Sequence, residues 1–77
     1  MPITVRYFAS LRESMGRDRD TVTTSGVSTV REVWSRVSGS PALPANTLAA
    51  VNMEYVETDH PVRDGDEVAF FPPVTGG

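Results

Sequence analysis

The stretch TVREVWSRV, residues 29–37, decides the fold of this 77-residue chain. Thr29 followed three residues later by Glu32 is the capping-box pattern that begins a helix. Apolar side chains then recur at helical spacing at Val30, Val33, Trp34 and Val37. Burying such side chains contributes about 1.5–3 kcal/mol each before entropy, so we expect this helix to be the main cover of a sheet. Trp34 is expected to pack in the core and not to stack on a ligand.

Two strands are predicted before this helix. From Ile3 to Ala9, apolar and polar side chains alternate with the period of a half-buried strand. Thr21 to Thr24 is β-branched and short, which favours a second strand that Ser25-Gly26 ends. We expect the two to form a β-hairpin with a wide loop.

The loop of that hairpin contains one local signal. Leu11 and Met15 lie four residues apart within Ser10 to Met15, and Gly16 follows. This pattern predicts one short helical turn closed by a glycine C-cap. The polar run RDRD, residues 17–20, is then predicted to be a solvated connection.

The segment after the main helix predicts a loop and two further strands. Ser38 to Thr47 contains two prolines and cannot continue the helix. Leu48 to Val51 is an apolar strand, Asn52-Met53 a candidate tight turn, and Tyr55-Val56 resumes the extended pattern. Arg63 to Asp66 has the composition of a further turn.

The last strand, Glu67 to Phe71, is the most clearly marked. Because side chains alternate along a strand, Phe70 and Phe71 must face opposite ways, so one aromatic ring joins the core and the other points outward. Pro72-Pro73 lacks backbone donors and ends the ladder. Residues 74–77 are therefore expected to form a flexible tail that projects from the domain.

This order of elements predicts an α+β fold of the β-grasp (ubiquitin-like) class, a mixed sheet packed on one main helix. We expect a single domain over residues 1–77, because 77 residues can bury only one small core. Such a domain is too small for a deep substrate cleft. The chain is accordingly expected to be a carrier or ligand that serves an enzyme.

The composition excludes several functions. With ten acidic residues against seven basic ones, the net charge is −3, and nucleic acid is not an expected partner. All seven basic residues are arginine, so an activated C-terminus would find no lysine on its own surface. Cysteine is absent as well, which rules out disulfides, thiolate nucleophiles and cysteine-ligated zinc.

Neither a membrane nor a metal is expected as a partner. The N-terminus lacks the basic and apolar regions of a signal peptide, no apolar run approaches spanning length, and we expect a cytoplasmic protein. The carboxylates Asp59, Asp64, Asp66 and Glu67 lack the spacing of a calcium loop. His60 has no convincing triad partner, so it is assigned no catalytic role.

The chain ends in Gly76-Gly77, where the function is expected to reside. Glycine has no Cβ, so a diglycine tail can thread a narrow channel and bring a terminal carboxylate close to a ligand. Docking such a tail orders its backbone at a cost of about 1–2 kcal/mol per residue. Compensation must come from the globular surface, and an outward Phe71 beside Pro72 and Pro73 is the expected anchor.

Several segments resemble one family. The run DGDEVAFFPPVTGG, residues 64–77, is the longest, and the others are AVN at 50–52, DHP at 59–61, YFA at 7–9, LRE at 11–13 and the helix at 29–37. Together they resemble the small subunit of molybdopterin synthase, the ubiquitin-like sulfur carrier of molybdenum cofactor synthesis. The likeness covers nearly the whole chain except the loop at 38–47.

The resemblance implies a reaction cycle centred on Gly77. An activating enzyme would adenylate its carboxylate with Mg-ATP, and a sulfurtransferase or other donor would convert the adenylate into a thiocarboxylate. The loaded tail would then donate sulfur to cyclic pyranopterin monophosphate in a heterotetramer of two small and two large subunits. The large subunit would supply the catalytic side chains, and the carrier itself would bind no cofactor.

The resemblance also implies which residues meet a partner. They are Phe71, Pro72, Pro73, Val74, Thr75 and Gly76, with Gly77 as the reacting terminus. Three alternatives stay open: a related carrier for thiamine, cysteine or tungsten-cofactor synthesis, a ubiquitin-like protein modifier, and an inert binding module.

Overall fold

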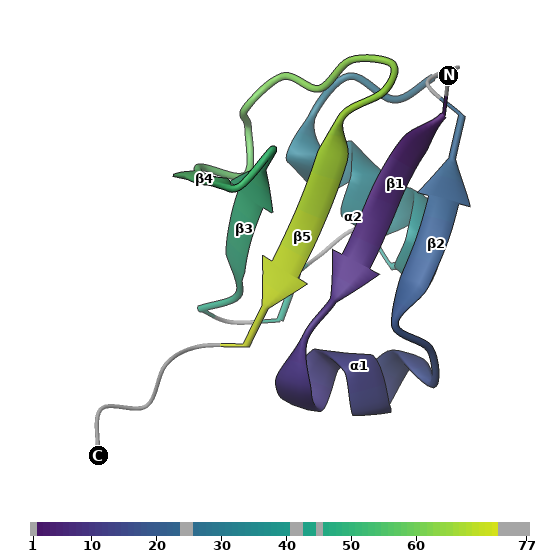
Figure 1. Cartoon of the computed structure of the whole chain (residues 1–77), viewed down its shortest axis with the longest axis vertical. Helices are drawn as coiled ribbons and strands as arrows, with labels where there is room; N and C mark the ends of the chain where they lie inside the picture. Colours follow the sequence, from purple (N-terminus) through teal and green to yellow (C-terminus); the bar gives the residue numbers. More distant parts are fainter. Residues whose placement is uncertain (1, 24–25, 41–42, 45, 73–77) are drawn as a thin grey trace.

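Five strands and two helices make up the computed structural model, which describes residues 2–23, 26–40, 43–44 and 46–72. In chain order the elements are β1 (Ile3–Tyr7), α1 (Ala9–Met15), β2 (Arg19–Val22), α2 (Val30–Ser38), β3 (Leu48–Val51), β4 (Glu54–Val56) and β5 (Glu67–Phe71). Figure 1 shows α2 crossing one face of the sheet and α1 lying beyond the lower end of β1 and β2. No helix among these residues is long and apolar enough to cross a membrane.

The last strand occupies the centre of the sheet, whose order is β2-β1-β5-β3-β4. It pairs in parallel with β1, where Val5 lies opposite Val68, and antiparallel with β3, where Ala50 lies opposite Ala69. The first and last strands are thus neighbours, and the sheet is mixed. The predicted ubiquitin-like β-grasp fold is confirmed.

The capping box at the start of α2 is present as predicted. Thr29 Oγ1 accepts a hydrogen bond from the Glu32 amide at 3.3 Å, and the Thr29 amide donates to Glu32 Oε1 at 3.1 Å. Val30, Val33 and Trp34 are buried against the sheet. Trp34 meets Phe70 edge-on with ring centroids 5.0 Å apart, so its predicted place in the core is confirmed.

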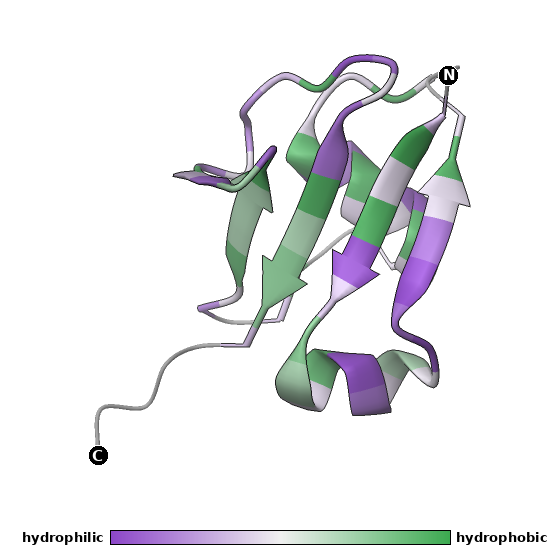
Figure 2. Cartoon of the chain, viewed as in Figure 1, coloured by the Kyte–Doolittle hydropathy of each residue, from purple (hydrophilic) through white to green (hydrophobic). Residues whose placement is uncertain are grey.

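β1 has the predicted alternation but ends earlier than expected. Ile3, Val5 and Tyr7 are buried, and the residues between them are partly exposed. Figure 2 shows hydrophobic and hydrophilic residues alternating along β1. The strand stops at Tyr7 because the chain turns away: Phe8 becomes the N-cap of α1, and Ala9 takes a left-handed φ of 52°. A non-glycine residue in this region costs about 1–2 kcal/mol, so packing must hold the turn in place.

β2 begins earlier than the sequence pattern indicates. Arg19 and Asp20, predicted to be part of a solvated connection, pair with β1 in the sheet. The Tyr7 hydroxyl donates a 2.9 Å hydrogen bond to Asp20 Oδ2. This bond gives the Asp20 carboxylate a partner within the sheet, so the residue is stabilised in a strand. The pKa of Tyr7 is raised above its ordinary value, mainly because the side chain is buried and to a smaller extent because its hydroxyl donates to Asp20. The strand ends at Val22, and Thr24 and Ser25 lie outside the described residues.

The predicted helical turn before β2 is confirmed. α1 ends at Met15, and Gly16 takes a left-handed φ of 73° while its amide donates to the carbonyls of Arg12 and Glu13. Arg17 then joins the elements around it: its guanidinium binds the Asp20 carboxylate and donates to the Met15 carbonyl at 3.2 Å and the Val37 carbonyl at 3.0 Å. The connection between α1 and β2 is therefore joined to the end of α2 by a hydrogen bond.

A two-residue turn connects β3 to β4, as predicted. Asn52 and Met53 have φ values of 50° and 72°, the two positive angles of a type I′ turn. The side-chain nitrogen of Asn52 donates to Asp66 Oδ1 at 3.0 Å, and the side-chain oxygen of Asn52 accepts from the backbone amide of Glu67 at 3.0 Å. These bonds join the β3–β4 turn to the start of β5. Of the predicted loop at 38–47, Ser38 is helical, and residues 41, 42 and 45 lie outside the description.

Candidate functional site

The end of β5 is the part of the predicted site that the structure places. Phe71 is the last residue of the strand, and both Phe71 and Pro72 are partly buried. The other predicted site residues, from Pro73 to Gly77, lie outside the described residues. What the structure defines is therefore the base from which the tail starts.

Phe71 lies on the face of the sheet opposite α2, as the outward member of the predicted pair. Its ring stacks on Phe8 with centroids 4.7 Å apart and planes 4° from parallel. On β4, the Tyr55 ring lies at 5.8 Å from the Phe71 ring in a tilted arrangement. We call Phe8, Phe71 and Tyr55 the aromatic row; it runs across the sheet from the end of β1 to β4.

Sequence reasoning missed Phe8 and Tyr55 as members of this site. Phe8 is 36% exposed and Tyr55 is 71% exposed, values that mark large apolar side chains on a surface. A signal was available for Phe8, because it continues the outward positions of Thr4 and Arg6 in the alternation of β1. No comparable signal for Tyr55 was available in the sequence, because its contact with Phe71 depends on the pairing of β3 with both β4 and β5.

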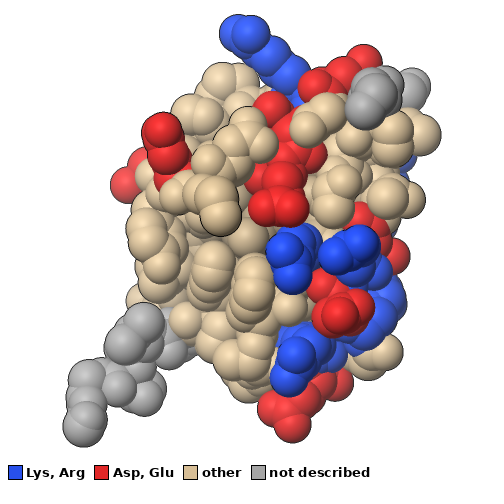
Figure 3. Space-filling model, in the orientation of Figure 1, with Lys and Arg blue, Asp and Glu red and all other residues tan. Residues whose placement is uncertain are grey.

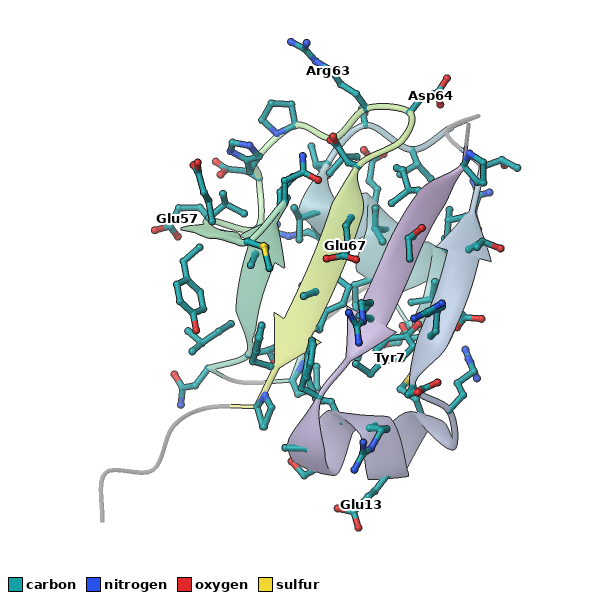
Figure 4. The ribbon with its side chains drawn as sticks, viewed as in Figure 1. Tyr7, Glu13, Glu57, Arg63, Asp64 and Glu67 are labelled. Atoms are coloured by element: carbon teal, nitrogen blue, oxygen red, sulfur yellow. The ribbon has the colours of Figure 1, made fainter. Side chains whose placement is uncertain are left out.

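Charges border the aromatic row. Figure 3 shows arginine side chains gathered over β1, β2 and α1, and a largely uncharged surface over β3 and the end of β5. Arg6 places its guanidinium 5.3 Å from the centroid of the Phe8 ring, an attractive cation–π position. Glu67 extends from the same face at the start of β5 (Figure 4). An apolar strip bordered by both basic and acidic side chains is suited to contact with another protein.

A groove follows the edge of the sheet beside β4. It encloses about 550 Å³ and is lined by Thr47, Leu48, Ala49, Tyr55, Val56, Glu57 and Thr58. Glu57 points outward there in Figure 4, and the lining holds no histidine or lysine that could activate a hydroxyl. Among the described residues, this lining offers no pairing of a nucleophile with a base.

Asp66, just before β5, stabilises two turns. Asp66 accepts from Asn52 and from the Arg63 amide, the latter at 2.8 Å, while Arg63 and Asp64 extend from the turn at the far end of β5 (Figure 4). Within residues 2–72, apart from the gaps given above, no group of three histidine, cysteine, aspartate or glutamate residues is placed to hold a metal ion.

Comparison with known proteins gives relatives over nearly the full length. A protein of Escherichia coli K12 named molybdopterin synthase sulfur carrier subunit is 46% identical over 80 residues, which cover 97% of this chain and 99% of that protein. Among solved structures, SAMP1 of Haloferax volcanii has a TM-score of 0.83 at 26% identity, with 100% of both chains covered. A chain of the BexX/CysO complex of Amycolatopsis orientalis has a TM-score of 0.68 at 27% identity, covering 97% of this chain and 99% of that one.

The family model described as the ThiS family matches residues 5–77, which include the aromatic row and the residues after β5. The match begins within β1 and extends over the other four strands and both helices. With the sequence identity over nearly the whole length and the β-grasp architecture, it follows that the chain belongs to the ThiS family.

Proposed function

We propose that this protein is the sulfur carrier subunit of molybdopterin synthase, with the carboxylate of Gly77 as the site of loading. The observation that carries the proposal is the 46% identity with the Escherichia coli sulfur carrier subunit over nearly the full length of both chains. The fold is consistent with it, because the segment that leads to Gly77 continues from the central strand of the sheet. The predicted partner-binding residues, 71–76, form the connection between that strand and the terminus.

Loading requires activation, because a carboxylate is a poor acylating group. In the proposed cycle a Gly77 oxygen attacks the α-phosphorus of Mg-ATP on an activating enzyme, and pyrophosphate leaves. A sulfur nucleophile at the level of hydrosulfide, delivered by a sulfurtransferase or another donor, then attacks the carbonyl and displaces AMP. The product is a thiocarboxylate whose sulfur is nucleophilic and tethered.

Transfer takes place in a large-subunit active site. The thiocarboxylate sulfur adds to a carbonyl-level carbon of cyclic pyranopterin monophosphate, and the oxygen of that carbon leaves as water. A second water then cleaves the acyl–sulfur bond, which restores the Gly77 carboxylate and leaves the sulfur on the pterin. A dithiolene contains two sulfurs, so each product consumes two loaded carriers, in keeping with a heterotetramer of two small and two large subunits. The large subunit supplies the acid and base groups. The reaction is placed in the cytoplasm, where ATP is available.

The composition of the chain suits this chemistry. It contains neither lysine nor cysteine, so an adenylate at Gly77 meets no side-chain amine or thiol of another copy of the carrier. Activated carriers at high concentration are thereby protected from reacting with each other through side chains. The same absence prevents lysine-linked chains.

A ubiquitin-like protein modifier is the second candidate. It is favoured by the TM-score of 0.83 with SAMP1, named a small archaeal modifier protein. The two candidates share adenylation and differ in the acceptor, which is a sulfur nucleophile for the carrier and a lysine of a target protein for the modifier. The higher sequence identity with the Escherichia coli protein favours the sulfur carrier.

The test is the intact mass of the untagged chain after incubation with its activating enzyme, Mg-ATP and a sulfur source. We expect a gain equal to one exchange of oxygen for sulfur, localised to Gly77, and no gain in a variant that lacks Gly77. Addition of large subunit and pterin precursor should then consume two loaded carriers per dithiolene. Transfer of the chain to protein lysines without any oxygen-to-sulfur exchange would instead establish the modifier.

A further inference from the structure

Two arginine side chains lie side by side next to the aromatic row. Arg6 of β1 is directly opposite Arg19 of β2 in the antiparallel ladder, and the Cβ atoms of residues in such a position are about 4.5–5.5 Å apart. Arg6 alternates with the buried side chains of β1, so both arginines belong to the face of the sheet opposite α2. Arg19 is exposed and Arg6 is half-buried. We call these two residues the arginine pair.

Within the described part of the chain, no carboxylate forms an ion pair with the arginine pair. Acidic side chains are visible around the arginines in Figure 3, but neither Arg6 nor Arg19 is bonded to one of the described carboxylates. Glu67 lies opposite Thr4, next to Arg6 on the same face. The Arg6 guanidinium is directed the other way along β1, over the Phe8 ring at 5.3 Å. Like charges directly opposite each other destabilise a sheet, so this pair lowers the stability of the free domain.

The guanidinium group suits one kind of partner group. Its planar fork binds the two oxygens of a carboxylate through hydrogen bonds that are stronger than those between neutral groups. We propose that the arginine pair binds carboxylates on the large subunit of the synthase and so extends the docking surface beyond the aromatic row. This inference rests on the proposed function, because it takes the large subunit as the partner of the carrier.

The position of the arginine pair supports an interface shared with the aromatic row. Arg6 contacts the Phe8 ring, and Phe8 in turn stacks at 4.7 Å on Phe71, the predicted anchor for the large subunit. A stable interface covers about 800 Å² of each partner, several times the area of one aromatic ring, so a partner that covers Phe71 is large enough to reach the arginine pair. The chain as a whole carries a net charge of −3. A local positive site on such a chain would fix the orientation in which an acidic surface docks.

Protection of the sheet edge does not explain both arginines. Charged side chains on an edge strand hinder its pairing with strands of other molecules. This role would suffice for Arg19, because β2 lies at one edge of the sheet. Arg6 is in β1, between β2 and β5, where there is no edge to protect. The placement of the two residues opposite each other therefore favours a role in recognition.

The test compares single variants of equal net charge. Arg6→Gln and Arg19→Gln each remove one charge of the arginine pair, and Arg63→Gln is the matched control, because Arg63 extends from the turn at the far end of β5 (Figure 4). Association of the full chain with immobilised large subunit is measured by surface plasmon resonance at low and high salt. At low salt we expect the association rate constant to fall about threefold in each variant of the pair and about tenfold in the double variant, with Arg63→Gln within about twofold of native. These differences should shrink at about 1 M salt, where the Debye length is about 3 Å.

Charge reversal identifies the carboxylates on the large subunit. Arg19→Glu should associate more slowly than Arg19→Gln, because it places a negative charge against an acidic surface. Replacing the opposing Asp or Glu of the large subunit by Lys should restore the association rate constant of Arg19→Glu to within about threefold of native. If each acidic surface residue of the large subunit is replaced in turn and none restores it, the proposal is overturned.

Four further results would overturn the proposal. They are a native association rate in the double variant, an equal loss in Arg63→Gln, and slower loading by the activating enzyme with unchanged association with the large subunit, which would assign the arginine pair to that enzyme. The fourth is a lower Tm in Arg19→Gln, because removal of a like-charge contact should leave Tm unchanged or higher. Failure of the native chain to associate with the large subunit would instead overturn the proposed function, whereas native association that is indifferent to the arginine pair overturns this inference alone.

Discussion

Phe70 and Phe71 are consecutive in β5, but their rings lie on opposite faces of the sheet and have different neighbours. Phe70 is 0% exposed and meets Trp34 beneath the sheet at 5.0 Å, whereas Phe71 is partly exposed and stacks on Phe8 at 4.7 Å. One strand therefore supplies both a core residue and a surface residue at the exit of the tail. The two rings can be tested separately.

Truncation of these rings should separate stability from binding. Phe70→Ala is expected to cost about 3–5 kcal/mol of unfolding free energy, because it leaves a cavity beside Trp34. Phe71→Ala should cost only about 0.5–1.5 kcal/mol, the worth of an aromatic pair, while weakening large-subunit binding by more than this amount. Urea unfolding followed by Trp34 fluorescence, together with calorimetric titration of large subunit, measures both. Equal losses of stability in the two variants would place Phe71 in the core.

Deletion of Gly77, or extension of the chain beyond it, is expected to abolish sulfur transfer without changing Tm. Gly77 comes after the last strand, and among the described residues the core cluster ends at Phe70. The measurements are turnover in a reconstituted synthase and differential scanning calorimetry. Normal turnover by the shortened chain would exclude Gly77 as the loading site.

The capping carboxylate of Glu32 should make the protein sensitive to acid. A hydrogen bond from the Ser28 hydroxyl, and further bonds from the Ser28 amide and from Thr29, lower the pKa of Glu32 below its ordinary value of 4.5. Because the folded pKa is depressed, the stabilisation is fully present above pH 4.5 and is lost as the pH falls through the folded value. Glu32→Gln should therefore be less stable than the native chain at pH 7, and the difference should shrink below pH 4.5. Urea unfolding at a series of pH values tests this, and a difference independent of pH would contradict it.

Met53→Gly is expected to stabilise the fold. Met53 has a left-handed φ of 72° and is 90% exposed, so its side chain adds strain with little packing in return. Asn-Gly is the preferred pair for a type I′ turn, and removing the strain should contribute about 1 kcal/mol. For a domain of this size that gain corresponds to a rise in Tm of about 4–8 °C. Met53→Ala keeps the Cβ and should show no comparable rise; equal Tm values for the two variants would exclude strain as the cause.

Local signals allowed most elements to be predicted from the sequence. The capping box fixes the start of α2, and the alternation in β1 marks its buried side chains, because both signals depend on neighbouring residues only. The start of β2 could not be predicted in this way. Arg19 and Asp20 look like a solvated run, and only the pairing with β1 and the bond from Tyr7 explain why they lie in a strand.

In the candidate site, too, features set by neighbouring residues could be predicted and features set by strand pairing could not. Opposite orientations of Phe70 and Phe71 follow from the geometry of any strand, so one outward ring was predictable, but the alternation alone does not say which of the two it is. Its neighbours were not, since Phe8 and Tyr55 reach Phe71 only through a sheet order in which β5 lies between β1 and β3. The residues beyond Pro72 lie outside the described residues, and their predicted role derives from glycine chemistry and from the family.

The central place of β5 also gives the carrier mechanical resistance. β1 and β5 are adjacent and parallel, so a pull applied between the start of the first strand and the end of the last loads their hydrogen bonds in shear, all at once instead of one by one. β3 holds the other edge of β5 in the same way. A pull on the C-terminal end of β5 therefore strains both ladders as a whole, and β5 cannot be separated from the sheet one hydrogen bond at a time.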